Sequence, residues 1–531
     1  MKQRFLLPIL AGALALGGCQ DLTVPNENTP SLEQVFSNGE DLENAVGTQF
    51  RIVWGVAQGS RTNSTYPVLG LAALGEELTS ANLYPFNVAS EPRSPLDNRD
   101  AGQWVNRKPW YDLYEAIATS TDALTALENG IKVGAVTTDR PNGAHAGRAR
   151  IFAKFIQGLG HIYIGMLFDK GWTRDETLPI NPATGRFVDE AQNAFKPYKE
   201  VTAFGIAKLE EAIALAGTLP LDTFPTTWIN GFTPTTSGLI PVMNSYIARA
   251  MVYSARNPQE RAAVDWAKVI QYLDKGIKTS FAQQASTSIT GTTSAYLQYT
   301  QLMTDARVDN LIVGYADTSG AFQTWLATPL AQRADFQVKT PDRRIHGATG
   351  PTVRGTLFEY RSAQTMPTTR GTYMHSRYRG IRYGTTYYQT GLIETMNLKE
   401  MEFLRAEAAY RLGDRATMVT ILNRTRVPAG LRPVTLTGPP PGQDCVPRRE
   451  DRSCGNLFDA FMYEKRIELF GLEAIIPFAD FRGWGRLPEG AIVHFPVHGR
   501  ELETLRLPYY SFGGDLPGSA PAPTGPFPGA P

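Results

Sequence analysis

A chain of 531 residues, of which 42% are hydrophobic, can bury a large core and by length alone could form roughly two to four domains. Its formal net charge is only +1 at pH 7, which argues against a nucleic-acid or polyanion partner, because such a partner is bound by a basic stripe. Beyond the N-terminus, no apolar run is long enough to be a transmembrane helix.

The N-terminus has the pattern of a secretory signal peptide. Two basic residues precede an apolar run from Phe5 to Leu16, and two glycines lead directly into Cys19. This run is shorter than the roughly 20 residues that a membrane-spanning helix needs. The ending Leu-Gly-Gly-Cys resembles the bacterial lipobox, in which the cysteine becomes the acylated first residue of the mature protein; the alternative is an ordinary signal peptide with a coincidental cysteine. We therefore expect a signal peptide over residues 1–18, a lipid anchor on Cys19 and a polar tether over residues 19–30.

Hydrophobic periodicity predicts amphipathic helices along the rest of the chain. They are expected over residues 110–127, 149–168, 198–216, 243–255, 266–277 and 398–412, and in one further helix that runs through Val427.

Two of the expected helix pairs share an outline. The first helix of each pair carries Ala and Tyr at close-packing positions, Ala248 with Tyr253 and Ala406 with Tyr410. Small residues opposite large ones let helices approach closely, as in tetratricopeptide hairpins. Because long stretches rich in Gly, Thr, Asn and Pro separate the pairs, we predict a mainly α fold: a scaffold of tetratricopeptide-like helical hairpins with long irregular loop insertions. The Pro/Gly-rich residues 513–531 are expected to form a disordered tail.

The cysteine pattern predicts one local disulfide. With Cys19 lipidated, only Cys445 and Cys454 remain, and they flank a polar loop in a chain that leaves the reducing cytoplasm. Metal binding by this pair is the alternative, but no histidine nearby completes a ligand set.

No arrangement of residues points to catalysis. The histidines are scattered, and His494 and His498, although four residues apart, are separated by the helix breaker Pro496. Glu76 and Glu77 could in principle serve a glycosidase, but adjacent helical residues do not oppose each other across a bond, as catalytic carboxylates must at about 5 Å or more. We therefore predict a protein that is not an enzyme and has no metal site and no cofactor.

The C-terminal third carries motifs of a known family. The segment 464–470 (EKRIELF), followed by 480–485 (DFRGWG), resembles the E-x-R-x-E-L and D-L-R-R-W-G signature of the SusD/RagB family. Residues 404–408 (LRAEA) and 422–426 (LNRTR) are similar to the helical hairpin that precedes this signature in the family. One departure lies between the signature halves: the family usually has E-G-x-R there, whereas Glu473 is followed by apolar residues and the arginine is absent. The resemblance extends over nearly the whole mature chain and implies an N-terminal SusD-like helical region over residues 31–280 and a C-terminal SusD/RagB-like region over residues 281–512.

The resemblance also implies a function. Members of this family are lipoproteins on the outer face of the outer membrane, which bind a nutrient and deliver it to a TonB-dependent β-barrel transporter as its lid. The ligand would be an oligosaccharide or, less commonly, a peptide. Two other functions stay open: a helical-repeat lipoprotein that scaffolds the envelope without a small ligand, and a helical-barrel glycan hydrolase.

Ligand contacts cannot be transferred from the family motifs, so we select them by chemistry. The loop that follows residue 79 combines rings with amides, a combination that suits sugar recognition because rings stack on apolar sugar faces and amides bind hydroxyls. The candidate ligand contacts are Asn82, Tyr84, Phe86 and Asn87, with Trp104 and Trp325 from neighbouring loop-rich segments. Alternatively, these rings fill loop cores or face the transporter barrel.

The signature itself suggests a structural role. Its charged residues lie on an otherwise apolar final helix and just beyond it, and buried carboxylates and guanidinium groups must be paired. We therefore expect a polar lock that ties this helix to the scaffold, formed by Glu464, Arg466, Glu468, Asp480 and Arg482.

Overall fold

The computed structural model describes eleven parts of the chain. They are residues 36, 38–59, 65–79, 98, 104–181, 186–302, 306–329, 332–362, 376–384, 386–487 and 491–510. The expected signal peptide, tether and C-terminal tail lie outside these residues.

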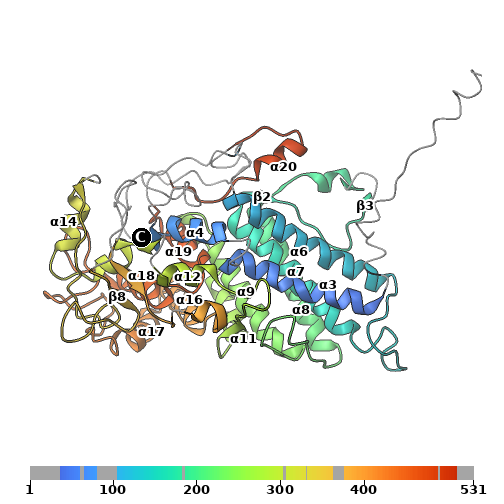
Figure 1. The fold of residues 1–531 in the computed structure, drawn as a ribbon, viewed down its shortest axis with the longest axis horizontal. Coiled ribbons are helices and arrows are strands. Elements are labelled where there is room, and N and C mark those ends of the chain that lie inside the picture. The colour runs from blue at the N-terminus through green and yellow to red at the C-terminus, as the bar shows by residue number, and fades with distance from the viewer. Residues whose placement is uncertain are drawn as a thin grey trace, which may run out of the picture.

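The N-terminal half is built from long helices that lie side by side (Figure 1). They are α3 (Gly39–Gln58), α4 (Thr65–Leu74), α6 (Trp104–Glu128), α7 (Ala146–Leu167), α8 (Tyr198–Thr218), α9 (Ile240–Tyr253), α10 (Pro258–Ala262) and α11 (Trp266–Lys275). Short 3-10 turns η1 (Glu190–Asn193) and η2 (Ser237–Leu239) lie in the connections.

Helix α7 is the centre of this half, with α6 and α8 on either side and further contacts to α3 and α9 (Figure 1). Its sequence allows close approach because glycines stand where a side chain would collide with the neighbour. A Cβ added at Gly158 would lie 2.6 Å from Leu209, and one at Gly165 would lie 2.1 Å from Thr202, both residues of α8. These two positions therefore set the short distance between α7 and α8.

The C-terminal half alternates short helices with strand pairs. Its helices are α12 (Ala295–Leu302), α13 (Asn310–Val313), α14 (Ala321–Ala327), α15 (Tyr387–Thr390), α16 (Leu398–Arg411), α17 (Arg415–Arg426), α18 (Leu457–Leu469), α19 (Ile475–Trp484) and α20 (Gly499–Thr504), with the 3-10 turn η3 (Gly314–Ala316).

The strands form separate two-stranded antiparallel pairs. The pairs are β1 (Leu78–Thr79) with β7 (Arg307–Val308), β2 (Lys170–Gly171) with β5 (Lys196–Pro197), β3 (Ile180–Asn181) with β4 (Arg186–Phe187), β6 (Phe281–Gln284) with β10 (Leu392–Met396), and β8 (Phe358–Tyr360) with β9 (Tyr378–Gly380). A strand from one half pairs with a strand from the other in β1–β7, which brings the end of α4 to the C-terminal half.

The prediction of a mainly α fold with helical hairpins is confirmed, with α9 and α11 forming one hairpin and α16 and α17 another. Two expectations differ in detail. The expected turn after α9 contains the additional helix α10, because Asn257 accepts the amide of Glu260 as an N-cap and Pro258 occupies the first helical turn. The long stretch rich in Gly, Thr, Asn and Pro between the two helix pairs, expected to be irregular, contains four short α-helices (α12 to α15) and several strands among its described residues.

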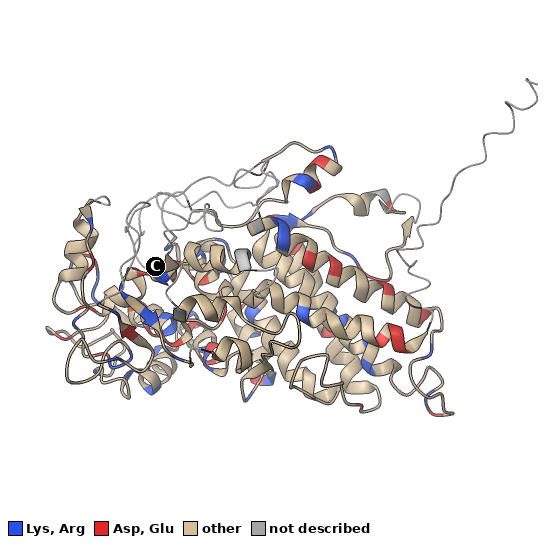
Figure 2. Cartoon of the chain, in the orientation of Figure 1, with Lys and Arg blue, Asp and Glu red and all other residues tan. Residues whose placement is uncertain are grey.

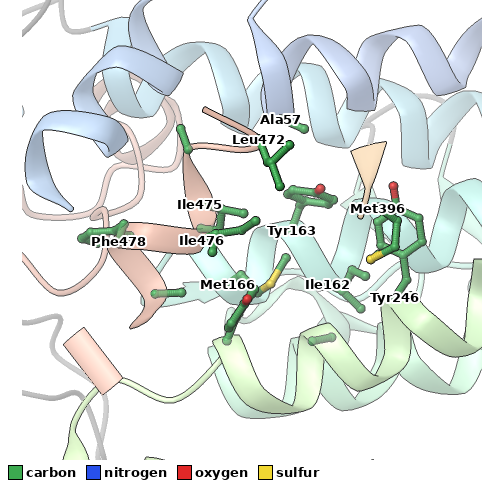
Figure 3. Packing of buried hydrophobic residues seen from close by; sticks show 14 of the residues in the cluster. Ala57, Ile162, Tyr163, Met166, Tyr246, Met396, Leu472, Ile475, Ile476 and Phe478 are labelled. Atoms are coloured by element: carbon green, nitrogen blue, oxygen red, sulfur yellow. The ribbon is translucent and has the colours of Figure 1, made fainter. Parts of the chain in front are cut away.

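One hydrophobic cluster runs from Phe36 to Leu502 and so includes residues of both halves. Figure 3 shows its middle, where Ile475 and Ile476 of the signature helix α19 lie close to Tyr163 and Met166 of α7. The apolar residues that follow Glu473, where the family usually has an arginine, thus form the packing surface of α19 against the N-terminal helices.

Charged groups occur at both ends of the scaffold, with both signs interspersed (Figure 2). No helix in the described part of the chain is long and apolar enough to cross a membrane.

Candidate functional site

The loop selected for ligand binding starts at β1. Its candidate residues Asn82, Tyr84, Phe86 and Asn87 lie outside the described residues, and α6 begins at Trp104, whose side chain is likewise not described. The start of the loop has a defined place, because β1 pairs with β7 and a Cβ on Gly75 would lie 2.6 Å from the backbone nitrogen of Phe478. The turn that precedes β1 therefore lies against α19.

Trp325 on α14 is the one ligand candidate whose side chain the structure describes. It is 4% exposed, and its ring lies 6.1 Å from the ring of Phe322 and the same distance from that of Phe336. The guanidinium of Arg333 covers the ring at 4.3 Å. These contacts place Trp325 in a small aromatic cluster that is separate from the main core. A contact between Trp325 and a ligand stays a prediction.

A solvent-open pocket lies between this aromatic cluster and α18. It is small, with a cavity volume of about 50 Å³, and it begins at α13, the helix that directly follows β7. We call it the disulfide pocket because the loop closed by Cys445 and Cys454 forms one of its walls. Its lining residues are Leu311, Ile312, Tyr315, Pro447, Arg448, Arg449, Glu450, Asp459, Met462, Tyr463, Arg466, Phe481 and Arg486.

A disulfide joins Cys445 and Cys454 and holds the wall formed by the loop between them. The sulfurs are thus bonded to each other, and within the described residues no three His, Cys, Asp or Glu side chains gather as a metal site would require. The loop is attached to the pocket's opposite wall at Tyr315. The amide of Arg448 donates to the Tyr315 carbonyl at 2.9 Å, and the Tyr315 hydroxyl donates to Glu450 at 2.8 Å.

Helix α18 starts at the pocket through a capping box. Asn456 accepts the amide of Asp459, and Asp459 accepts the amide of Asn456, so both free amides of the first turn are satisfied. Asp459 also accepts a hydrogen bond from Arg449 at 2.7 Å and lies 3.6 Å from Arg486. The carboxylate oxygens of Asp459 are therefore already bonded to groups of the protein itself.

Arg466 lies in both the pocket wall and the core. Its guanidinium donates to the carbonyl oxygens of Gly75, Glu76 and Leu311 and lies 3.8 Å over the ring of Phe481. Burial without a hydrogen-bonded carboxylate lowers the pKa of Arg466 to about 10. This side chain joins α18 to the turn between α4 and β1, and therefore to the start of the candidate ligand loop.

The turn held by Arg466 is strained and contains an unusual carboxyl. Glu76 has a φ of +51°, a left-handed conformation that costs a side-chain-bearing residue energy. Its neighbour Glu77 is buried, accepts hydrogen bonds from the Tyr296 hydroxyl and the Gly471 amide, and lines a second, smaller cavity together with Arg466. Desolvation by burial raises the pKa of Glu77 to about 7.

The expected lock residues are all buried, but each is paired outside the set. Arg344 donates to Glu464 at 2.6 Å and to Glu468 at 2.8 Å, because these two residues lie one turn apart on the same face of α18. Asp480 accepts from Arg261 and from Lys465, each at 2.8 Å.

Arg482 completes the set in a different manner. Its guanidinium donates to the carbonyls of Met166, Tyr253, Ala255 and Val493, and so connects the ends of several chain segments. Sequence reasoning missed the main partners Arg344 and Arg261, since they lie more than a hundred residues before the signature and no local spacing points to them.

Comparisons with known proteins identify the fold. No family model and no curated protein matches the sequence. Among solved structures, the chain is similar to a SusD superfamily protein from Parabacteroides distasonis (TM-score 0.53, 13% identity, covering 88% of this chain and 96% of that one). It is also similar to a SusD-like protein from Bacteroides fragilis (0.52, 13%, 86% and 89%) and to a SusD-like carbohydrate binding protein from Bacteroides vulgatus (0.50, 16%, 84% and 83%). The chain thus has the SusD-like fold that its motifs predicted.

Removal of the Arg466 guanidinium should destabilise the protein. Arg466→Ala leaves three buried carbonyl oxygens without their donor, and we expect the free energy of unfolding in urea to fall by about 3 kcal/mol. The matched control is Arg424→Ala, because Arg424 forms only an exposed ion pair with Glu402 and should change stability by about 0–1 kcal/mol. Equal effects of the two substitutions would show that the Arg466 contacts contribute nothing beyond a surface pair.

Glu77 should make stability depend on pH. Its pKa in the folded state is about 7, above the unfolded value of 4.5, so the unfolded chain releases this proton first and stability falls as pH rises from about 4.5 to 7. The loss attributable to this group should approach about 3 kcal/mol. Glu77→Gln should abolish this part of the pH dependence, seen as a gain in stability relative to wild type at pH 8 but not at pH 4. The exposed Glu402→Gln serves as the control. A constant difference between Glu77→Gln and wild type across this range would contradict the raised pKa.

Proposed function

We propose that the protein is a surface-exposed outer-membrane lipoprotein that binds a nutrient and delivers it to a TonB-dependent transporter as its lid. The ligand is an oligosaccharide or, as the second choice, a peptide. The observation that carries this proposal is the SusD-like fold together with the family signature, whose charged residues are buried in the middle of that fold. One of the similar structures is described as a SusD-like carbohydrate binding protein.

The arrangement of the described residues supports binding at the α18 end of the scaffold. The turn that precedes β1 and the candidate ligand loop lies against α19, and the disulfide pocket opens next to the same turn, since Arg466 contacts both. The pocket has mainly apolar walls and a few polar groups, and its volume of about 50 Å³ leaves room for one small group of a ligand, such as a carboxylate. In this proposal Asn82, Tyr84, Phe86, Asn87, Trp104 and Trp325 supply further ligand contacts.

We propose binding without catalysis. Of the two adjacent glutamates that could serve a glycosidase, Glu77 is buried and held by Tyr296 and Gly471. Glu76 is also buried, and its carbonyl accepts a hydrogen bond from Arg466. Neither carboxyl lines the disulfide pocket. Acyl chains on Cys19 attach the protein to the membrane, and the scaffold itself supplies the surface toward the transporter.

Co-purification tests the proposed function directly. Tagged protein extracted in detergent should bring down a large β-barrel protein, and a membrane-impermeant reagent should label it on intact cells. Cys19→Ser is the control, because the unacylated protein should leave the membrane fraction. Capture of periplasmic proteins without a barrel, together with protection from surface labelling, would contradict the transporter-lid function and favour an envelope scaffold.

Tyr84→Ala tests the ligand loop. Removal of a stacking ring should weaken the glycan or peptide that binds wild type by about 1–3 kcal/mol in calorimetry, with little change in Tm. The control is Tyr272→Ala on α11, a partly exposed ring outside both the loop and the pocket. Unchanged affinity would exclude Tyr84 from the site, and a large fall in Tm would show that its ring packs in the core.

A further inference from the structure

The disulfide pocket has more positive than negative groups, although the whole chain is nearly neutral. Its walls include four arginines and two acidic residues. Asp459 is taken up by the capping box, Arg449 and Arg486, and Glu450 accepts the hydroxyl of Tyr315. Both carboxylates of the pocket therefore already accept hydrogen bonds within the protein. The four guanidinium groups outnumber them, which leaves the pocket with a net positive charge.

Two of these arginines lack a hydrogen-bonded carboxylate among the described residues, although Asp309 and Glu77 lie near enough to Arg466 to offset part of the lowering of its pKa by burial. Within the described part of the chain, neither Arg448 nor Arg466 forms an ion pair, and both use backbone carbonyls as acceptors. The Nε atom of each is buried and has no hydrogen-bond partner among the described residues. Guanidinium groups bind planar carboxylates strongly, often through two parallel hydrogen bonds. A carboxylate-bearing ligand would thus supply the directly bonded carboxylate that these two arginines lack.

The remaining walls are apolar or aromatic. Leu311, Ile312, Pro447, Met462 and Phe481 are apolar, and Tyr315 adds an aromatic side chain whose hydroxyl is already bonded. The Arg466 guanidinium lies 3.8 Å from the centre of the Phe481 ring, so its charge is held at an apolar surface. A sugar ring has an apolar face and, when it is a uronic acid, a single carboxylate at its edge.

From this geometry we propose that the disulfide pocket binds the carboxylate of a uronic-acid residue in the oligosaccharide ligand, with Arg448 and Arg466 as the recognising groups. The proposal rests on the proposed function and specifies its substrate class. It concerns one acidic sugar in one pocket, and is compatible with a net charge of +1, which argues only against an extended polyanion partner.

The test compares an acidic oligosaccharide with its uncharged methyl ester. Calorimetry on the full-length mature protein uses trigalacturonic acid, its methyl ester, neutral maltotriose and xylotriose, and triglutamate. Trigalacturonic acid should bind at least about tenfold more tightly than the ester, because only the acid offers a charged partner to the guanidinium groups.

Arg448→Gln should abolish the preference for the acid, and Arg448→Lys, which retains the charge, should keep most of it. The control is Arg354→Gln, an exposed arginine outside the pocket, which should leave the preference unchanged. Tm and titration of free thiols confirm that each variant retains its fold and its disulfide.

Every outcome decides the proposal. Acid and ester of equal affinity, no binding of the acid, or a preference that survives in Arg448→Gln would overturn it. Binding of triglutamate but not of trigalacturonic acid would also overturn it and assign the pocket to an acidic peptide. If neutral glycans bind and the barrel co-purifies, the proposed function stands while the uronate assignment falls; if no glycan or peptide binds and no barrel is captured, the proposed function itself falls.

Discussion

Arg261 has no exposed surface, and a guanidinium group in that position is costly to bury unless acceptors satisfy its N–H groups. Glu407 of α16 and Asp480 of α19 supply them, with hydrogen bonds of 2.7 and 2.8 Å. Because Arg261 belongs to α10, one buried ion pair network holds the N-terminal hairpin, the family hairpin and the signature helix together. The positions of α18 and α19, and so of everything that rests on them, depend on this pairing.

Arg249 is a second buried arginine whose guanidinium group is held by carboxylates. It bonds to Glu400 and to Glu473, and the latter also accepts the hydroxyl of Tyr163 on α7. Separating any of these partners would leave a charge in the core, and the cost of an unpaired buried charge exceeds that of losing a surface pair several times over. The buried charges therefore specify which helices meet, while the apolar cluster around Ile475 and Ile476 supplies the driving force for burial.

The same helix that completes the core also forms the pocket. Residues of α18 on one face bond to Arg344, whereas Arg466 on another side holds the strained turn at Glu76. A rigid base under a loop suits a binding protein, since pre-organised groups lose less freedom when a ligand arrives. The disulfide between Cys445 and Cys454 then holds the loop that forms the opposite wall.

Much of this protein was determined by its sequence alone. The helical periodicity, the mainly α fold, the family signature and the burial of its charged residues followed from local patterns, because helix formation and capping depend on residues a few positions apart. The pairing of Cys445 with Cys454 is likewise local. The partners of the signature were not predictable: Arg344 lies 120 residues before Glu464, and Arg249 lies 224 residues before Glu473. The pocket, the surplus of arginines in it and the raised pKa of Glu77 arise from groups that only tertiary packing brings together, since burial and distance in space set their charges, and neither can be read from spacing along the chain.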